Sequence, residues 1–185
     1  MRTGILDWSG TSRSLLFALT GILLFVFWVV ARPSFEMTAS MTEWPRVLWF
    51  SGTLLSLAVA LPVFGRMVGG QRVVRLASIA GGGVGLSSVA NIFEDGFGIE
   101  GFFFLIILGA LILDVALLAL TIVIGRTALG RYRLLAGIPA GTVVGILLFV
   151  AAGGPIMLIT WLAAAAAAVK MSGRRTPVPA APTTS

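Results

Sequence analysis

Six long apolar segments, separated by short polar loops, constrain the fold of this chain more than any other feature. A helix needs about 20 apolar residues to cross the hydrocarbon core of a bilayer. The segments that reach or approach this length are Ser14–Ala31, Val47–Gly65, Val73–Phe93, Gly101–Ile124, Leu134–Ala151 and Pro155–Val169. We therefore expect an all-α integral membrane protein, a bundle of six transmembrane helices that occupies residues 1–170.

The composition agrees with lipid as the solvent. Of the 185 residues, 58% are hydrophobic and 11% are charged, whereas a soluble domain carries about 25% charged residues. The chain has no His and no Cys, which excludes disulfides, thiolate chemistry, haem ligation by His and ordinary zinc sites. Neither a GxSxG motif nor a nucleotide-binding loop is present. The sequence thus predicts no enzyme and no cofactor.

The charges of the loops predict the orientation, since cytoplasmic loops carry an excess of Lys and Arg. With the N-terminus inside, eleven basic residues lie on the inner side, and only Arg32 and Arg46 lie outside. Five of the seven acids fall outside. We expect both termini to be cytoplasmic. The net charge of +6 does not indicate nucleic-acid binding, because the basic residues sit at helix ends rather than in one patch with interleaved aromatics.

The two ends of the chain differ in kind. The first segment resembles a signal peptide in its basic flank, but its apolar run is longer than usual and Val29–Ala31 is a poor cleavage site. A retained first span is favoured, with cleavage as the alternative. The tail, residues 171–185, is rich in Pro, Ala and Thr and is expected to be a disordered cytoplasmic segment. Arg outnumbers Lys twelve to one, which indicates a GC-rich bacterial genome and a cell-membrane location.

Pro155–Val169 is the shortest of the six segments, at fifteen residues. Six spans are predicted, but this length leaves open the alternatives that the segment lies partly in the membrane interface or packs inside the bundle. Gly153, Gly154 and Pro155 predict the turn before it, since Pro is accepted at a helix start. Trp28, Trp44 and Trp49 lie near the expected outer ends of the first two helices, as in an aromatic belt.

Asp114 is the most unusual residue, because it lies near the midplane of an otherwise almost wholly apolar segment. A carboxylate at that depth costs at least about 2.5–3.5 kcal/mol, so it is normally paired, neutral or functional. Counting from the helix ends, its depth matches Ser56 and Thr142, and no basic residue lies inside a span. A neutral acid that ionises when water enters would suit a proton-linked carrier. The structural alternative is a protonated Asp hydrogen-bonded to a neighbouring helix.

The third segment is rich in small and polar residues. Ser87, Asn91 and Asp95 continue one stripe spaced four residues apart. Gly81 with Gly85, and likewise Gly141 with Gly145, have the GxxxG spacing that lets helices approach closely. The structural interpretation places the third and fifth helices at the tightly packed centre. The functional alternative is a polar track from Ser87 to the outer surface.

Two weaker patterns complete the sequence. Glu94, Asp95 and Glu100 form an acidic outer loop whose oxygen atoms could hold a divalent cation, although a solvated turn is the simpler interpretation. Gly65–Gly85 and Gly125–Gly145 share seven of 21 positions at an offset of sixty. This similarity indicates either a duplicated helical hairpin or a shared bias toward Gly, Ala and Val.

Two classes of function remain. The first is an accessory or structural subunit that packs in the bilayer against another membrane protein or a second copy. The second is a small proton-linked transporter with Asp114 as the titrating group and the third helix as the polar path. The absence of a complete site in the sequence favours the first class.

Overall fold

The computed structural model describes residues 10–36 and 44–172. Within these ranges every regular element is helical, and there is no strand. Six α-helices follow in order: α1 (Gly10–Glu36), α2 (Trp44–Val68), α3 (Gln71–Asn91), α4 (Phe103–Thr127), α5 (Gly137–Leu147) and α6 (Gly154–Ser172). Three short helical pieces join them: η1 (Ile92–Gly96), η2 (Gly130–Ala136) and η3 (Phe149–Gly153). The all-α prediction is confirmed.

Five helices are long and apolar enough to cross a membrane: Gly10–Val30, Trp44–Val68, Gln71–Gly96, Phe103–Thr127 and Ala151–Ser172. The remaining apolar helix, Tyr132–Leu147, is shorter. The sequence therefore misjudged which helix is short. α6 has 19 residues and continues through Met171 and Ser172, which the sequence assigned to the tail, whereas α5 has 11. Six spans remain a prediction, and the tail beyond Ser172 lies outside the described residues.

α5 is short because the segment changes helix type at both ends. It is preceded by the 3-10 turns of η2, and it gives way after Leu147 to η3, where Ala152 has the non-helical angles φ −141° and ψ 16°. The run from Leu134 to Ala151 is apolar across both changes of helix type, so hydropathy alone did not indicate them. The turn at Gly153 and Gly154 lies where the sequence predicted it, with Pro155 in the first turn of α6.

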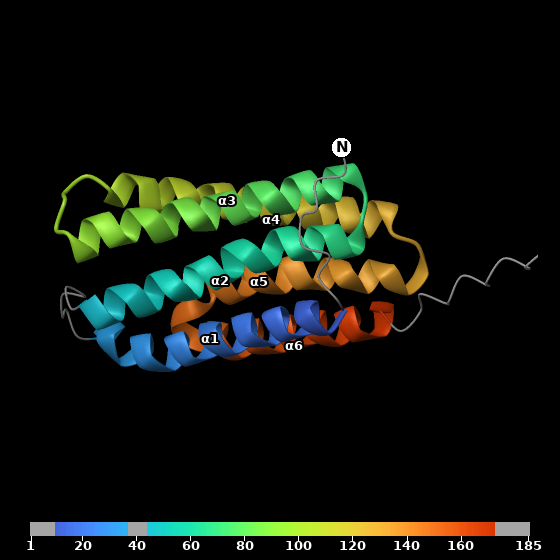
Figure 1. The fold of residues 1–185 in the computed structure, drawn as a ribbon, viewed down its shortest axis with the longest axis horizontal. Coiled ribbons are helices and arrows are strands. Elements are labelled where there is room, and N and C mark those ends of the chain that lie inside the picture. The colour runs from blue at the N-terminus through green and yellow to red at the C-terminus, as the bar shows by residue number, and fades with distance from the viewer. Residues whose placement is uncertain (1–9, 37–43, 173–185) are drawn as a thin grey trace, which may run out of the picture.

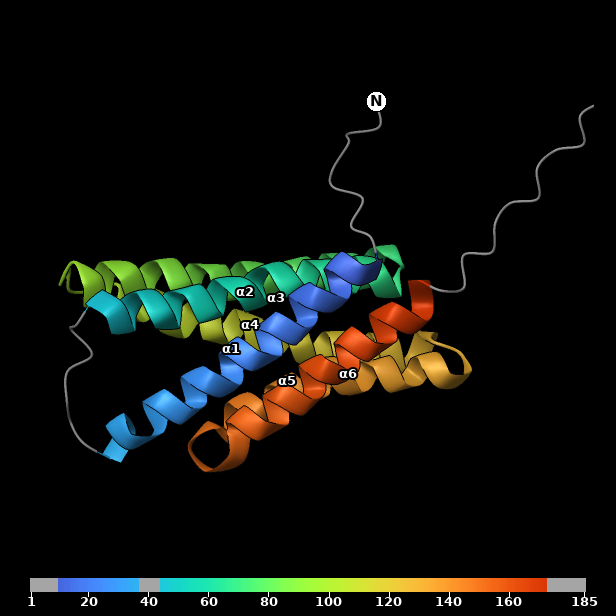
Figure 2. The ribbon, with the colours of Figure 1, turned by 60° about the horizontal axis from the view of Figure 1, so that its bottom comes forward.

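The helices form a closed ring of neighbours, in which each packs against the next in sequence and α6 packs against α1. Figures 1 and 2 show α1 and α6 side by side, although they lie at opposite ends of the chain. One hydrophobic core receives side chains from all six helices, with Phe17, Phe64 and Trp161 among its largest fully buried members. Phe17 contacts both other rings, at centroid distances of 6.4 and 5.7 Å.

Both described ends of the chain lie at the same end of the bundle, because Gly10 approaches Ser172 (Figure 1). This end also carries the α2–α3 turn and the connection from α4 to α5. The described basic side chains found there are Arg13, Arg66, Arg72, Arg75, Arg126, Arg133 and Lys170. We call it the basic end. That it faces the cytoplasm remains a prediction from the loop charges.

Glycine determines how closely α3 packs between α2 and α4. A Cβ at Gly81 would lie 2.6 Å from the carbonyl oxygen of Ala58 on α2, and one at Gly83 would lie 2.6 Å from that of Gly109 on α4. Only glycine permits such backbone approach. The predicted tight packing of the third helix is thus present on two sides. On α5, Gly141 and Gly145 instead pack closely on Thr160 and Met157 of α6.

The two windows that resemble each other occupy similar places but fold differently. Gly65–Gly85 passes through a turn in which Gly69 and Gly70 have φ angles of 85° and 87°, and it then enters the unbroken helix α3. Gly125–Gly145 enters the 3-10 turns of η2 before α5 begins. Both windows turn at the basic end (Figure 1). The duplication hypothesis is therefore supported by the sequence similarity and by the shared position of the two turns, but not by the helices that follow them, which differ.

Candidate functional site

Asp114 lies on the flank of α4 that faces away from the α3 contact. Gly83 of α3 approaches backbone atoms of Gly109 and Leu113 and the side chain of Ile112. Successive residues of a helix are rotated by about 100° about its axis. Ile112 and Asp114 are therefore rotated from Leu113 in opposite senses, so that Ile112 lies toward α3 and Asp114 lies on the other flank. Its side chain is half-buried, between the buried line of Leu113, Leu117 and Leu120 and the exposed line of Leu111, Val115 and Leu118.

One carboxyl oxygen of Asp114 is buried and has no partner. Among the described residues, no hydrogen bond reaches Oδ1. The two hydroxyls expected at the same depth are engaged elsewhere: Ser56 Oγ donates to the Thr53 carbonyl at 2.7 Å, and Thr142 Oγ1 donates to the Ile138 carbonyl at 2.9 Å. Both therefore bond within their own helices. The structure does not join Asp114, Ser56 and Thr142 into one hydrogen-bonded site.

The polar stripe of α3 is used to join helices. Ser87 is buried and donates to the Ile106 carbonyl of α4 at 2.9 Å. Ser88, the next residue of α3, donates to the Ser51 carbonyl of α2 at 2.9 Å, and Ser51 Oγ donates back to the Ser88 carbonyl at 3.2 Å. Asn91 Nδ2 donates to Ser51 Oγ at 3.2 Å. Ser87 and Asn91 therefore bond to opposite neighbours.

These bonds bear directly on the functional interpretation of α3. A polar path needs hydroxyl and amide groups that are open to water or to a passing solute. Here Ser51, Ser88 and Asn91 are each at most 3% exposed, and each donates to a group on the facing helix. These bonds favour the packing interpretation for Ser87 and Asn91, whereas no such bond involves Asp95 among the described residues.

The acidic turn acts locally as a cap. Glu94 Oε2 accepts a hydrogen bond from the backbone N–H of Phe103 at 2.9 Å, which satisfies one free donor at the start of α4. Glu94 and Asp95 are half-buried and Glu100 is exposed. In the described ranges no three acidic side chains come together as a metal ion would need. Stacked rings of Phe93 and Phe102, at 5.0 Å, support the same turn.

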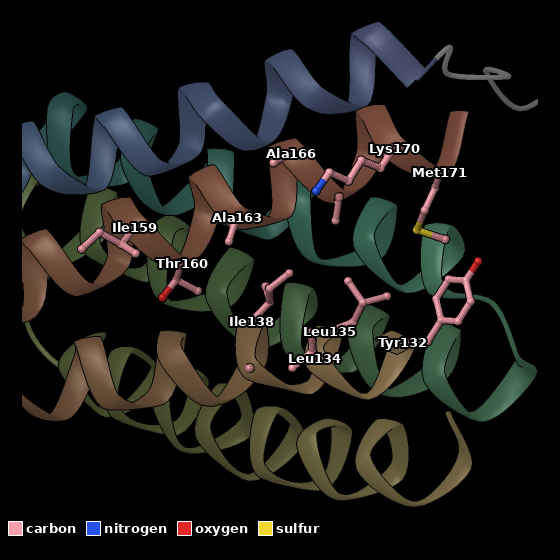
Figure 3. Close-up of a pocket in the computed structure, with 12 residues that line it drawn as sticks. Tyr132, Leu134, Leu135, Ile138, Ile159, Thr160, Ala163, Ala166, Lys170 and Met171 are labelled. Carbon is pink, nitrogen blue, oxygen red and sulfur yellow. The ribbon is translucent and has the colours of Figure 1, made fainter. Parts of the chain in front are cut away.

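A groove that the sequence did not predict opens between η2, α5 and α6 toward the basic end. Its volume is about 540 Å³, within the range of ligand sites in proteins, which is roughly 300–1,000 Å³. Figure 3 shows Ile138, Ile159, Thr160 and Ala163 along the groove, with Tyr132, Lys170 and Met171 toward one end. It forms because short α5 leaves the small residues of α6 uncovered. The run of alanines in the sequence predicts that this segment is helical, but it does not predict which face of the helix a neighbouring helix leaves uncovered.

A second hollow of similar size lies at the basic end. It is lined by residues of the α2–α3 turn, the end of α4 and the segment that follows, and it shares Tyr132 and Met171 with the groove. Asp114 lines neither of these two spaces. The midplane acid and the cavities are therefore separate features.

An all-helical bundle with five helices long and apolar enough to cross a membrane indicates a multi-pass membrane protein. No protein-family model, curated protein or solved structure matches the chain. Any more specific function must therefore be argued from the geometry of its own residues.

Proposed function

We propose that the protein is an accessory membrane subunit that packs in the bilayer against another membrane protein. The observation that carries this proposal is the position of Asp114. It lies at the edge of the exposed face of α4, and one of its carboxyl oxygens is buried without a partner. Intramembrane acids usually pair with another polar group, and polar side chains hydrogen-bond across helices when membrane proteins associate.

The exposed face of α4 gives such a partner a surface. Phe104, Leu111, Val115 and Leu118 are each more than half exposed. Apolar exposure alone is the normal state of a lipid-facing helix, so it does not distinguish lipid from protein. Asp114, at the edge of this face, does distinguish them, because lipid chains offer its carboxyl group no hydrogen bond whereas a protein partner can. Because Oδ1 is buried in the bundle, a neutral Asp114 would donate to a carbonyl or hydroxyl of the partner from its other carboxyl oxygen.

The proton-linked transporter is the weaker alternative. The polar residues expected to form its path bond between α2, α3 and α4. Asp114 is outside both cavities described above. What supports this alternative is the same partnerless oxygen, which would suit a group that exchanges protons.

Site-specific photo-crosslinking in native membranes tests the subunit proposal. A photoreactive residue at Val115, which is 59% exposed on α4, is compared with one at Val59, which is 46% exposed on α2. We expect a discrete protein adduct from position 115 only. Asp114→Leu should abolish it, and Asp114→Asn, which can still hydrogen-bond, should retain it. An adduct of twice the subunit mass would identify the partner as a second copy.

Two results would count against the proposal. Lipid adducts alone at position 115, or the same protein adduct from both positions, would remove the evidence for a specific partner on α4. A proton leak in liposomes that contain the purified wild type, lost in Asp114→Asn, would favour the transporter. In every variant the thermal unfolding midpoint must stay close to that of the wild type, so that loss of the adduct does not reflect loss of the fold.

A further inference from the structure

The groove between α5 and α6 has two chemically different parts. Its middle is apolar, formed by Leu135, Ile138, Ile159 and Ala163. Its end toward the basic end of the bundle carries Tyr132 and Lys170. An apolar channel that ends at a phenol and an ammonium group matches a molecule with a hydrocarbon chain and a negatively charged head.

The length of the groove matches one leaflet of a bilayer. Thr160 and Lys170 both line it, and the ten residues between them along α6 correspond to about 15 Å at 1.5 Å per residue. The hydrocarbon core is about 30 Å thick, so one leaflet contributes about 15 Å. If α6 spans the membrane, the groove runs from near the midplane to the level of the head groups.

The polar groups lie where a head group would be. Tyr side chains favour the membrane interface, because the ring is apolar and the hydroxyl is polar. Figure 3 shows the Lys170 side chain lying back along α6 on the side of Ala166, so that its ammonium group lies over the groove. Arg126 and Arg133 lie at the same end of the bundle. Positive charge at this level attracts anionic lipids.

We propose that this groove binds one anionic phospholipid from the leaflet at the basic end. An acyl chain lies between α5 and α6 against Ile138, Ile159 and Ala163. The phosphate pairs with the ammonium group of Lys170, and the Tyr132 ring lies at the end of the groove toward the head-group level. The short helix α5 is what leaves room for the chain, and the lipid completes the bundle on this side.

The groove suits a lipid better than a partner helix. A helix with its side chains is about 10–12 Å across and needs a long apolar face, whereas this space of about 540 Å³ is bounded at one end by Lys170. A lipid acyl chain can fill an apolar groove of this size, and its negatively charged head group can pair with the ammonium group of Lys170. This site is independent of Asp114 and of the proposed partner surface on α4.

Native mass spectrometry of the purified protein in detergent tests the proposal with defined lipids. Phosphatidylglycerol and phosphatidylcholine with identical acyl chains are titrated separately, and inorganic phosphate is added as a third probe. We expect one phosphatidylglycerol to bind at least tenfold more tightly than phosphatidylcholine. Phosphate alone should not compete, because it lacks the chain that fills the groove.

Two variants locate the site. Lys170→Gln should reduce the preference for phosphatidylglycerol at least fivefold, and Lys170→Arg should retain it. Ala163→Phe places a ring in the groove at an exposed position and should weaken both lipids. The matched controls are Arg72→Gln, an exposed basic residue on α3, and Leu162→Phe, an exposed position of α6 outside the groove. Neither control should change binding.

The proposal is overturned if both lipids bind equally, if Lys170→Gln leaves the preference for phosphatidylglycerol intact, or if Ala163→Phe leaves the binding of both lipids unchanged. Thermal unfolding in lipid-free detergent is measured for each variant as a check on folding. A variant that unfolds early is replaced by Ala166→Phe, which also alters an exposed residue of the groove. Retained selective binding in that variant likewise counts against the proposal.

Discussion

Ser51 of α2 and Ser88 of α3 exchange hydrogen bonds, each hydroxyl donating to the backbone carbonyl of the other residue, at 3.2 and 2.9 Å. Both side chains are almost fully buried. The pair is reciprocal, so it fixes the rotation and the axial register of the two helices together. In a membrane, where lipid and helix surfaces are equally apolar, such bonds and close packing contribute to the association of helices.

Removing the two hydroxyls should have unequal effects. Ser88→Ala deletes one interhelical bond, worth about 0.6 kcal/mol in a membrane protein. Ser51→Ala also leaves the buried amide of Asn91 without its partner, so we expect a cost of about 1–3 kcal/mol. Unfolding free energies of both variants in bicelles check this order. Equal losses would mean that the Asn91 bond contributes nothing.

Neighbouring glycines of α3 should respond in opposite ways to alanine. A Cβ at Gly83 would lie 2.6 Å from the Gly109 oxygen and 2.9 Å from the Leu113 nitrogen, whereas a Cβ at Gly82 meets nothing within 4 Å. Gly83→Ala must separate two backbones and should destabilise the protein by about 1–3 kcal/mol. Gly82→Ala should be neutral or stabilising by up to about 1 kcal/mol. Thermal unfolding midpoints distinguish the two, and equal losses would contradict the α3–α4 contact.

Glu94 and Glu100 offer a matched pair of acids in one turn. Glu94→Gln weakens the charge-assisted bond to the Phe103 N–H, and Glu94→Ala removes it. We expect the alanine variant to lose about 0.5–2 kcal/mol, as for other helix caps. Glu100 is exposed, so Glu100→Ala should change the unfolding free energy by less than about 0.5 kcal/mol. A larger loss at Glu100 would argue against capping by Glu94.

Trp28 of α1 holds the turn between α5 and α6. Its indole N–H donates to the Phe149 carbonyl at 2.5 Å, and its side chain lies against Gly154. Trp28→Phe keeps an aromatic ring but loses the hydrogen bond, so we expect a loss of about 1 kcal/mol. Gly154→Ala should cost more, because its Cβ would overlap the indole. Trp49→Phe, at a residue 43% exposed on α2, is the control, and all three are compared by thermal unfolding.

Hydropathy predicted where the helices lie, because the length of an apolar run reports directly on burial in lipid. It misjudged α5 and α6, because helix type and length also depend on local backbone geometry, such as the non-helical angles of Ala152, which hydropathy does not contain. Ser87 and Asn91 were recognised as members of a polar stripe on the third segment. Their partners were not, since a stripe of hydroxyls has the same spacing whether it faces a pathway or a packed helix.

The position of Asp114 in an apolar run identified it as unusual from the sequence. The residues around it could not be predicted in that way. Ser56 and Thr142 were matched to it by depth alone, but depth does not specify rotation about each helix axis. Both hydroxyls bond within their own helices. The groove was missed for a related reason, because it depends on which face of α6 the short helix α5 leaves uncovered.

The pairing of α1 with α6 has a consequence for how the protein is made. The ribosome releases α1 well before α6, yet each is the other's neighbour. Until α6 has been synthesised, Phe17 and Gly21 have no Trp161 to pack against. The first helix must therefore wait in the lipid beside the insertion machinery while the other five are synthesised. A nascent chain that stops before α6 leaves this seam open, as a surface that quality-control proteases can recognise.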